Sequence, residues 1–177
     1  MSTVRDEHEL FAAWMNLLQA QSVVSEALED RLQADSGLSL AEHEALSRMA
    51  GSPEGDLRMA ELADLMLVSK SGVTRLIDRL EARGLVARRA CETDRRATYA
   101  AITEKGRLTA ERAWPVLAEG LTESFSRHLG DADVKALRKA MRKILTGNGK
   151  WEDTRCSVGF QEHVAPRAAQ TGERSAG

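Results

Sequence analysis

Residues 69–84 decide the fold: they are Ser-Lys-Ser-Gly-Val-Thr-Arg-Leu-Ile-Asp-Arg-Leu-Glu-Ala-Arg-Gly. In a helix from Lys70 to Arg83, a rotation of 100° per residue puts the bulky apolar side chains on one face (Val73, Leu76, Ile77 and Leu80). The opposite face carries hydroxyls and charges (Ser71, Thr74, Arg75 and Asp78, flanked by Lys70 and Arg79). Ser69 favours the start of a helix and Gly84 its end. The stretch therefore predicts an amphipathic helix with a polar, mostly basic outer face.

The residues on either side extend this helix into a larger motif. A short helix is expected from Met59 to about Met66, and only Leu67 to Ser69 separate it from the next one, which is typical of a helix-turn-helix. Two runs compatible with β-strands follow, Leu85 to Arg89 and Thr98 to Ile102, on either side of a polar tip. A two-stranded ribbon is marginal alone and must pack on the helices. The sequence thus predicts a winged helix-turn-helix.

The polar face of the 70–83 helix has side chains suited to a DNA major groove. Arginine binds guanine O6 and N7 with two hydrogen bonds, and hydroxyls reach bases or phosphates. We expect base contacts from Ser71, Thr74 and Arg75, and phosphate contacts from Lys70 and Arg79. Two arginines at the ribbon tip, Arg95 and Arg96, would suit a narrow minor groove.

The charge distribution agrees with this expectation. Between Lys70 and Arg107, ten Lys or Arg stand against five Asp or Glu, a net charge of +5, while the rest of the chain carries −7. A basic middle in an acidic chain favours a surface that binds a polyanion. A solvated helix face would give the same count, so charge alone leaves both interpretations open.

Long amphipathic helices are expected on both sides of the motif. Apolar residues from Glu9 to about Ala34 follow helical spacing (Leu10, Trp14, Leu17, Val24, Leu28 and Leu32). Ser39 and Glu42 predict a capping box for a helix to Ala50, followed by a turn over 51–56. Thr103 is expected to cap a helix from Glu104 to about Leu129, and Asp131 to cap a last helix that Gly147 ends.

The predicted fold class is mainly α with a small two- to three-stranded β-wing. The winged helix-turn-helix occupies 39–103, and a helical dimerisation region occupies 9–36 and 104–147. Two long apolar stripes and a short last helix need more partner surface than the central motif offers, which favours a homodimer. Residues 148–177 are polar and without periodicity, and we expect this tail to be disordered.

Composition argues against other classes of protein. The 177 residues contain no apolar signal sequence and no run of about 18 apolar residues, so we expect no membrane span. Two cysteines, Cys91 and Cys156, do not form a disulfide framework, which favours a reduced, cytoplasmic protein. The four histidines lack metal-ligand spacing, and no phosphate-binding loop or catalytic dyad is visible. We expect neither an enzyme nor a bound metal or cofactor.

Five segments in order resemble the winged helix-turn-helix of the MarR family, the multiple-antibiotic-resistance regulators. They are Glu61-Leu-Ala63, Ser69-x-Ser71-x-Val73-Thr-Arg75-x-Ile77-x-x-Leu80, Gly84-Leu-Val-x-Arg88, Asp94-x-Arg96 and Ile102-Thr-x-x-Gly106. Each segment alone is weak, but together, at these spacings, they are specific. With the flanking helices, the resemblance covers roughly residues 9–146.

The resemblance implies an obligate homodimer that binds double-stranded DNA. Two-fold symmetry then predicts a pseudo-palindromic operator with half-sites roughly 10 bp apart. By the same resemblance, Asp94 orients Arg96 in the minor groove, and the protein represses transcription until a small aromatic or anionic effector, or an oxidant, releases it.

Three aromatic side chains are candidates for an effector pocket: Trp14, His43 and Trp114. Each of them has core or dimer packing as an alternative role, because aromatic residues at helical spacing are usually buried.

Two other functions remain open beside a DNA-binding regulator. One is a winged-helix protein–protein interaction module that does not bind DNA. The other is a cysteine-based redox regulator, because Cys91 lies beside Arg88 and Arg89, whose charges would lower a thiol pKa.

Overall fold

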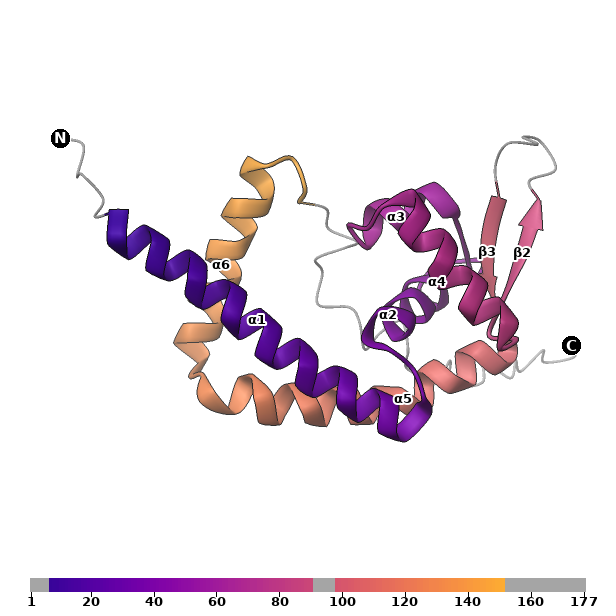
Figure 1. The fold of residues 1–177 in the computed structure, drawn as a ribbon, viewed down its shortest axis with the longest axis horizontal. Coiled ribbons are helices and arrows are strands. Elements are labelled where there is room, and N and C mark those ends of the chain that lie inside the picture. The colour runs from indigo at the N-terminus through magenta and orange to yellow at the C-terminus, as the bar shows by residue number, and fades with distance from the viewer. Residues whose placement is uncertain (1–6, 91–97, 152–177) are drawn as a thin grey trace, which may run out of the picture. The chain divides into compact units, whose positions relative to one another are not determined.

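The computed structural model describes residues 7–90 and 98–151 and shows, within them, six α-helices, a 3₁₀ turn and a three-stranded sheet (Figure 1). In chain order the elements are α1 (Glu7–Ser36), α2 (Leu40–Ala50), β1 (Asp56–Arg58), α3 (Met59–Leu65), α4 (Lys70–Ala82), β2 (Val86–Ala90), β3 (Thr98–Ile102), α5 (Glu104–Ser124), η1 (Ser126–His128) and α6 (Asp131–Gly147). The predicted fold class, mainly α with a small β-wing, is confirmed.

The described residues divide into two compact units. The flanking unit comprises 7–43 and 112–151, and the central unit comprises 44–90 and 98–111. The divisions fall inside α2, between His43 and Glu44, and inside α5, between Glu111 and Arg112. The central unit thus contains the whole helix-turn-helix and its sheet.

The apolar face of α4 forms much of the core of the central unit. Its four apolar residues are all buried, as their spacing predicts (Val73, Leu76, Ile77 and Leu80). Leu62 of α3 and Val86 of β2 are buried as well. Full burial of such side chains stabilises the fold by about 1.5–3 kcal/mol each, so the core determines which face of α4 remains outside.

The sheet is antiparallel in the order β1-β3-β2. β2 and β3 match the two expected runs, with Val86 opposite Ile102 and Ala90 opposite Thr98. β1 corrects the expectation of a turn through residue 56, because Asp56 pairs with Ala101. Arg58 anchors β1 further by donating from Nε to the hydroxyl of Tyr99 at 2.8 Å. Three residues are too few to show strand alternation in a sequence.

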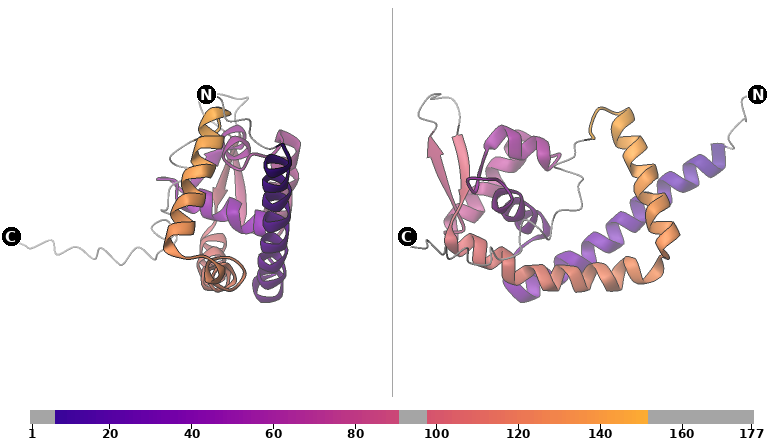
Figure 2. Two further views of the ribbon diagram at one scale, coloured as in Figure 1. Left: turned by 90° about the vertical axis from the view of Figure 1, so that its left-hand side faces the viewer. Right: turned by 180° about the vertical axis from the view of Figure 1, so that it is seen from behind.

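In the flanking unit α1 lies beside the second half of α5, as Figure 1 and Figure 2 show. Gly120 permits this close approach, since a Cβ there would lie 2.7 Å from Cδ2 of Leu28 and 3.0 Å from Cδ of Arg31. Arg31 also forms an ion pair with Glu123 of α5. Leu28 and Leu32 are the two buried residues of α1.

Helix boundaries follow the predicted caps with two corrections. Ser39 and Glu42 form the expected capping box, with backbone-to-side-chain hydrogen bonds of 3.1 Å in both directions. α5 ends at Ser124 rather than near Leu129, and the chain continues as a 3₁₀ turn. Asp131 is the first residue of α6 and not its cap; Gly130 occupies the cap position and donates its N–H to Asp133 at 3.0 Å.

Candidate nucleic-acid interface

The start of α4 is organised by Ser69. Its hydroxyl oxygen accepts the N–H of Gly72 at 3.0 Å and lies 3.1 Å from the hydroxyl of Ser71. This bond satisfies one of the N–H groups that the first turn of a helix leaves without a partner. At the other end, Gly84 adopts a φ of 69°, the left-handed conformation that favours glycine. Both predicted caps are confirmed, and they fix the length of the exposed helix face.

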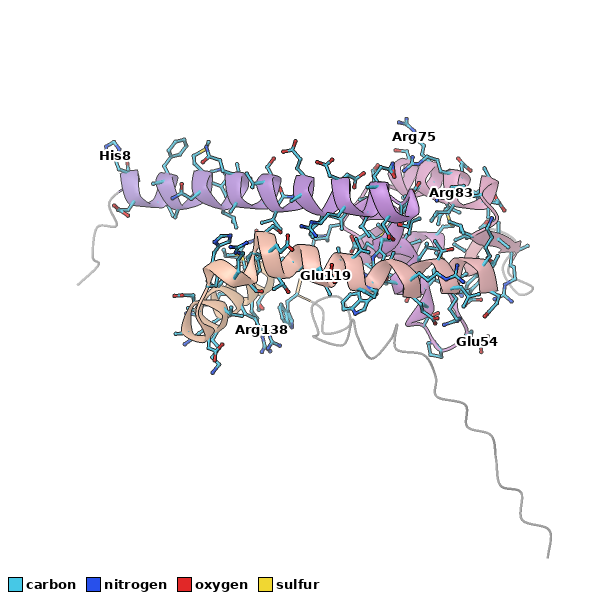
Figure 3. All side chains as sticks on the ribbon, turned by 90° about the horizontal axis from the view of Figure 1, so that it is seen from below. His8, Glu54, Arg75, Arg83, Glu119 and Arg138 are labelled. Carbon is cyan, nitrogen blue, oxygen red and sulfur yellow. The ribbon has the colours of Figure 1, made fainter. Side chains whose placement is uncertain are left out.

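Five side chains expected to contact DNA belong to α4, and all five are exposed (Lys70, Ser71, Thr74, Arg75 and Arg79). In Figure 3 the side chain of Arg75 extends away from the ribbon. The side chain of Arg75 makes no hydrogen bond or ion pair with any other residue that the structure describes. Its guanidinium therefore retains all five N–H donors for an external acceptor.

Thr74 has a more restricted capacity than the sequence suggests. Its hydroxyl donates to the backbone carbonyl of Lys70, one turn earlier, at 2.8 Å. A hydroxyl has one hydrogen and two lone pairs, so Thr74 retains only acceptor capacity and its methyl group. It therefore suits an amino group of adenine or cytosine, or a thymine methyl group.

Arg88 of β2 is bound to α4 by four hydrogen bonds that the sequence does not predict. Its Nη1 donates to Glu81 at 2.6 Å, and its Nη2 donates to Asp78 at 2.6 Å and to the carbonyl of Thr74 at 3.3 Å. Its backbone N–H donates to the second carboxylate oxygen of Glu81 at 3.1 Å. We call Arg88, Thr74, Asp78 and Glu81 the Arg88 clamp.

The clamp stabilises the charged form of the Arg88 guanidinium. The hydrogen bond that Arg88 donates to Asp78 raises the pKa of Arg88 above its ordinary value, burial lowers it, and the charges of Asp78 and Glu81 raise it further. An arginine is already protonated throughout the range in which proteins fold, so Arg88 keeps its positive charge beside the two carboxylates of the clamp. On the other side of β2, Arg89 forms an ion pair with Asp56 of β1. Two of the basic residues counted in the sequence are therefore paired with carboxylates.

The end of α4 is tied to the start of α5. Lys105 donates from Nζ to the carbonyl of Arg83 at 2.7 Å, and the Thr103 hydroxyl donates to the carbonyl of Gly84 at 2.8 Å. The backbone N–H of Thr103 donates to the carbonyl of Leu85 at 3.0 Å. A lysine at this end also suits the negative end of the helix dipole. These bonds hold the last turn of α4 in place within the central unit.

The predicted wing-tip residues Asp94, Arg95 and Arg96 lie outside the described residues, and so does Cys91. Their roles remain predictions.

The structure brings together two of the three candidates for an effector pocket. His43 is buried, and its ring stacks on Trp114 with the centroids 6.5 Å apart and the planes at 21°. Trp14 is 53% exposed. Glu29 of α1 lies next to the start of α2, because it accepts the N–H of Leu40. Trp14 lies fifteen residues before Glu29, which is about 22 Å along α1. Trp14 therefore lies apart from the His43–Trp114 pair.

The described part of the chain has neither a metal-binding cluster nor a membrane-spanning helix. Within residues 7–90 and 98–151 no three His, Cys, Asp or Glu side chains lie close enough together to hold a metal ion. None of the helices in those ranges combines the length and the apolar character needed to span a membrane.

Comparison with known proteins identifies a family and its relatives. The model of the MarR family matches residues 36–97. The HTH-type transcriptional regulator MhqR of Bacillus subtilis is 31% identical over 91 residues, which cover 51% of this chain and 62% of MhqR. The transcriptional repressor MprA of Escherichia coli is 28% identical over 102 residues, which cover 58% of this chain and 57% of MprA. The chain thus spans less than two thirds of the length of either relative.

A solved structure extends the likeness over most of the fold. Sco3205, a MarR family transcriptional regulator from Streptomyces coelicolor crystallised in complex with DNA, aligns with a TM-score of 0.75 and 28% identity. The alignment covers 79% of this chain and 91% of Sco3205. The similarity therefore includes the flanking helices as well as the central unit.

Proposed function

Because the chain belongs to the MarR family of winged-helix transcriptional regulators, we propose that it binds a pseudo-palindromic operator as a homodimer and represses transcription until a small aromatic or anionic molecule releases it. The site of action would be the chromosome in the cytoplasm. The observation that carries the proposal is the exposed polar face of α4, opposite a face that is fully buried.

In this proposal α4 enters the major groove with its N-terminal half leading. Ser71, Thr74 and Arg75 contact base edges, while Lys70 and Arg79 contact phosphates. A good arginine–guanine pair discriminates against the wrong base by about 1–3 kcal/mol. Arg95 and Arg96 enter the minor groove, with Asp94 orienting Arg96, as the resemblance to the family implies.

The homodimer is supported by exposed apolar side chains in the flanking unit. On α1 they are Leu10, Phe11, Trp14, Met15, Leu18 and Val23, and on α6 they are Val134 and Ile144. Apolar side chains clustered on one element mark an interaction surface more often than a solvated one. We propose that 9–36 and 104–147 form the dimerisation region and that 39–103 bind DNA. One protomer then contacts each half-site, with the half-sites roughly 10 bp apart.

Repression and release rest on two lines of support. MprA, a relative over 58% of the chain, is named as a repressor. The buried His43 stacked on Trp114 offers aromatic surface with a polar edge, which suits a small aromatic acid. We propose that this pair lines the effector site and that Trp14 belongs to the dimer surface.

A binding experiment at two salt concentrations tests the function. The purified full chain is titrated onto the DNA upstream of its own gene and onto a random duplex of equal length. We expect tighter binding to the upstream DNA and a steep loss of affinity with salt, because phosphate contacts release counterions. Absence of binding to both duplexes would refute the proposal in favour of a protein–protein interaction module.

A further inference from the structure

The Arg88 clamp joins β2 to three successive turns of α4. Thr74, Asp78 and Glu81 follow one another at intervals of four and three residues, which places them along one side of the helix. Glu81 holds both the backbone and the side chain of Arg88. The strand therefore cannot shift along the helix without breaking several charge-assisted hydrogen bonds at once.

The clamp also neutralises an acidic group on the DNA-facing side of α4. Asp78 shares the polar face with Thr74 and Arg75, and its side chain is 55% exposed. An unpaired carboxylate at that place would repel a phosphate backbone. Arg88 lies within hydrogen-bonding distance of Asp78 and is itself only 28% exposed. Its charge is thus directed at the protein's own carboxylates and not outward.

We propose that Arg88 is a positioning residue for DNA binding: it holds β2 against α4 and masks the carboxylates of Asp78 and Glu81, without contacting DNA itself. The inference rests on the proposed function. It differs from the expectation for Lys70, Arg75 and Arg79, whose exposed side chains lie on the surface that would meet the duplex.

The test is an affinity titration of Arg88→Met, which keeps most of the side-chain length and removes the charge. We expect the affinity for the upstream DNA to fall by about tenfold, which is typical when one member of a hydrogen-bonded network of charged side chains is removed. The slope of log affinity against log salt should change by clearly less than one unit, because no phosphate contact is lost and only the exposed Asp78 carboxylate adds repulsion. Loss of one phosphate contact would lower that slope by about 0.9.

The pair Asp78→Asn and Arg88→Met separates masking from simple loss of charge. Removing the Asp78 carboxylate should raise the affinity more in the Arg88→Met background than in the unsubstituted protein, where Arg88 already masks it. Equal gains in both backgrounds would overturn the masking role. Such a cycle isolates the coupling between two residues in contact.

Two controls protect the result from misfolding and from non-specific charge effects. Arg88→Lys keeps the charge but lacks the planar fork that reaches three acceptors, so we expect an intermediate loss at an unchanged slope. Arg89→Met removes the neighbouring arginine, which pairs with Asp56 and not with α4, and should leave the preference for upstream over random DNA unchanged. Thermal unfolding by circular dichroism identifies any variant that is not folded.

The outcomes distinguish the inference from the proposed function. If the unsubstituted protein binds neither duplex, the proposed function fails and the inference fails with it. If it binds and Arg88→Met binds equally well, or if the salt slope falls by about one unit, only the positioning role is overturned. Equal losses for Arg88→Met and Arg89→Met would also overturn it.

Discussion

A Cβ atom at position 106 would overlap the carbonyl oxygen of Leu85, so Gly106 and Leu85 are in direct backbone contact. The same carbonyl accepts the N–H of Thr103, and the Thr103 hydroxyl accepts the N–H of Gly106 at 3.0 Å. The spacing Thr-x-x-Gly thus combines a helix cap with a close approach of two backbones. It places the first turn of α5 directly against the chain that leaves α4.

Gly106→Ala should destabilise the protein by about 2–3 kcal/mol, because the added methyl group meets a backbone oxygen that cannot rotate away. Thermal and urea unfolding followed by circular dichroism measure the change. Gly147→Ala is the matched control, since nothing lies within 4 Å of its added Cβ. It should be neutral or slightly stabilising, and equal losses for the two variants would contradict the backbone contact.

Leu67, in the turn between α3 and α4, should tolerate glycine unusually well. Its φ of 55° is unfavourable for a residue with a side chain by about 1–2 kcal/mol, and glycine removes that strain. The loss of a side chain that is 53% exposed offsets this gain. We expect the free energy of unfolding of Leu67→Gly to stay within about 0.5 kcal/mol of the unsubstituted protein.

The neighbouring Val68 provides the comparison. It is 41% exposed and does not have a positive φ, so Val68→Gly gains no relief from strain. It should lose about 1 kcal/mol or more from backbone entropy and lost burial. Urea unfolding gives the free energy of unfolding of both variants. A larger loss of stability for Leu67→Gly than for Val68→Gly would show that the positive φ of Leu67 costs little free energy.

Arg75→Ala should weaken binding to the upstream DNA by about 1–3 kcal/mol and reduce the preference over random DNA. Lys70→Ala should weaken binding to both duplexes alike and lower the salt slope by about one unit. Fluorescence anisotropy with both duplexes at several salt concentrations measures the two effects. An unchanged preference in Arg75→Ala would remove that residue from base recognition.

Local patterns in the sequence were sufficient for α4 and its caps. Ser69 and Gly84 act within one turn of the residues they cap, and helical spacing alone separates the buried face of α4 from the exposed one. The capping box of Ser39 and Glu42 is local in the same way. Such features depend only on residues a few positions apart in the chain, so they can be predicted from the sequence.

Features that depend on pairing between elements were missed. β1 is three residues long and exists only because β3 pairs with it. The Arg88 clamp needs β2 to lie against α4, so the sequence showed Arg88 only as a basic residue of a family motif, without its partners on α4. The hydroxyl of Thr74 has a neighbour one turn away, but whether it donates there or outward depends on its rotamer. The roles of the α4 residues in DNA binding remain predictions.

Trp14→Glu should convert the proposed dimer into monomers, because an unpaired carboxylate in an apolar interface costs several kcal/mol. Trp14 is exposed on a helix that also exposes Phe11 and Leu18, so we expect the substitution to leave the fold of the single subunit unchanged. Light scattering after size-exclusion chromatography gives the mass. Ala60→Glu adds the same charge at an exposed position on α3, outside the proposed dimerisation region, and should leave the mass unchanged. A dimer of undiminished stability in Trp14→Glu would place the dimer surface elsewhere.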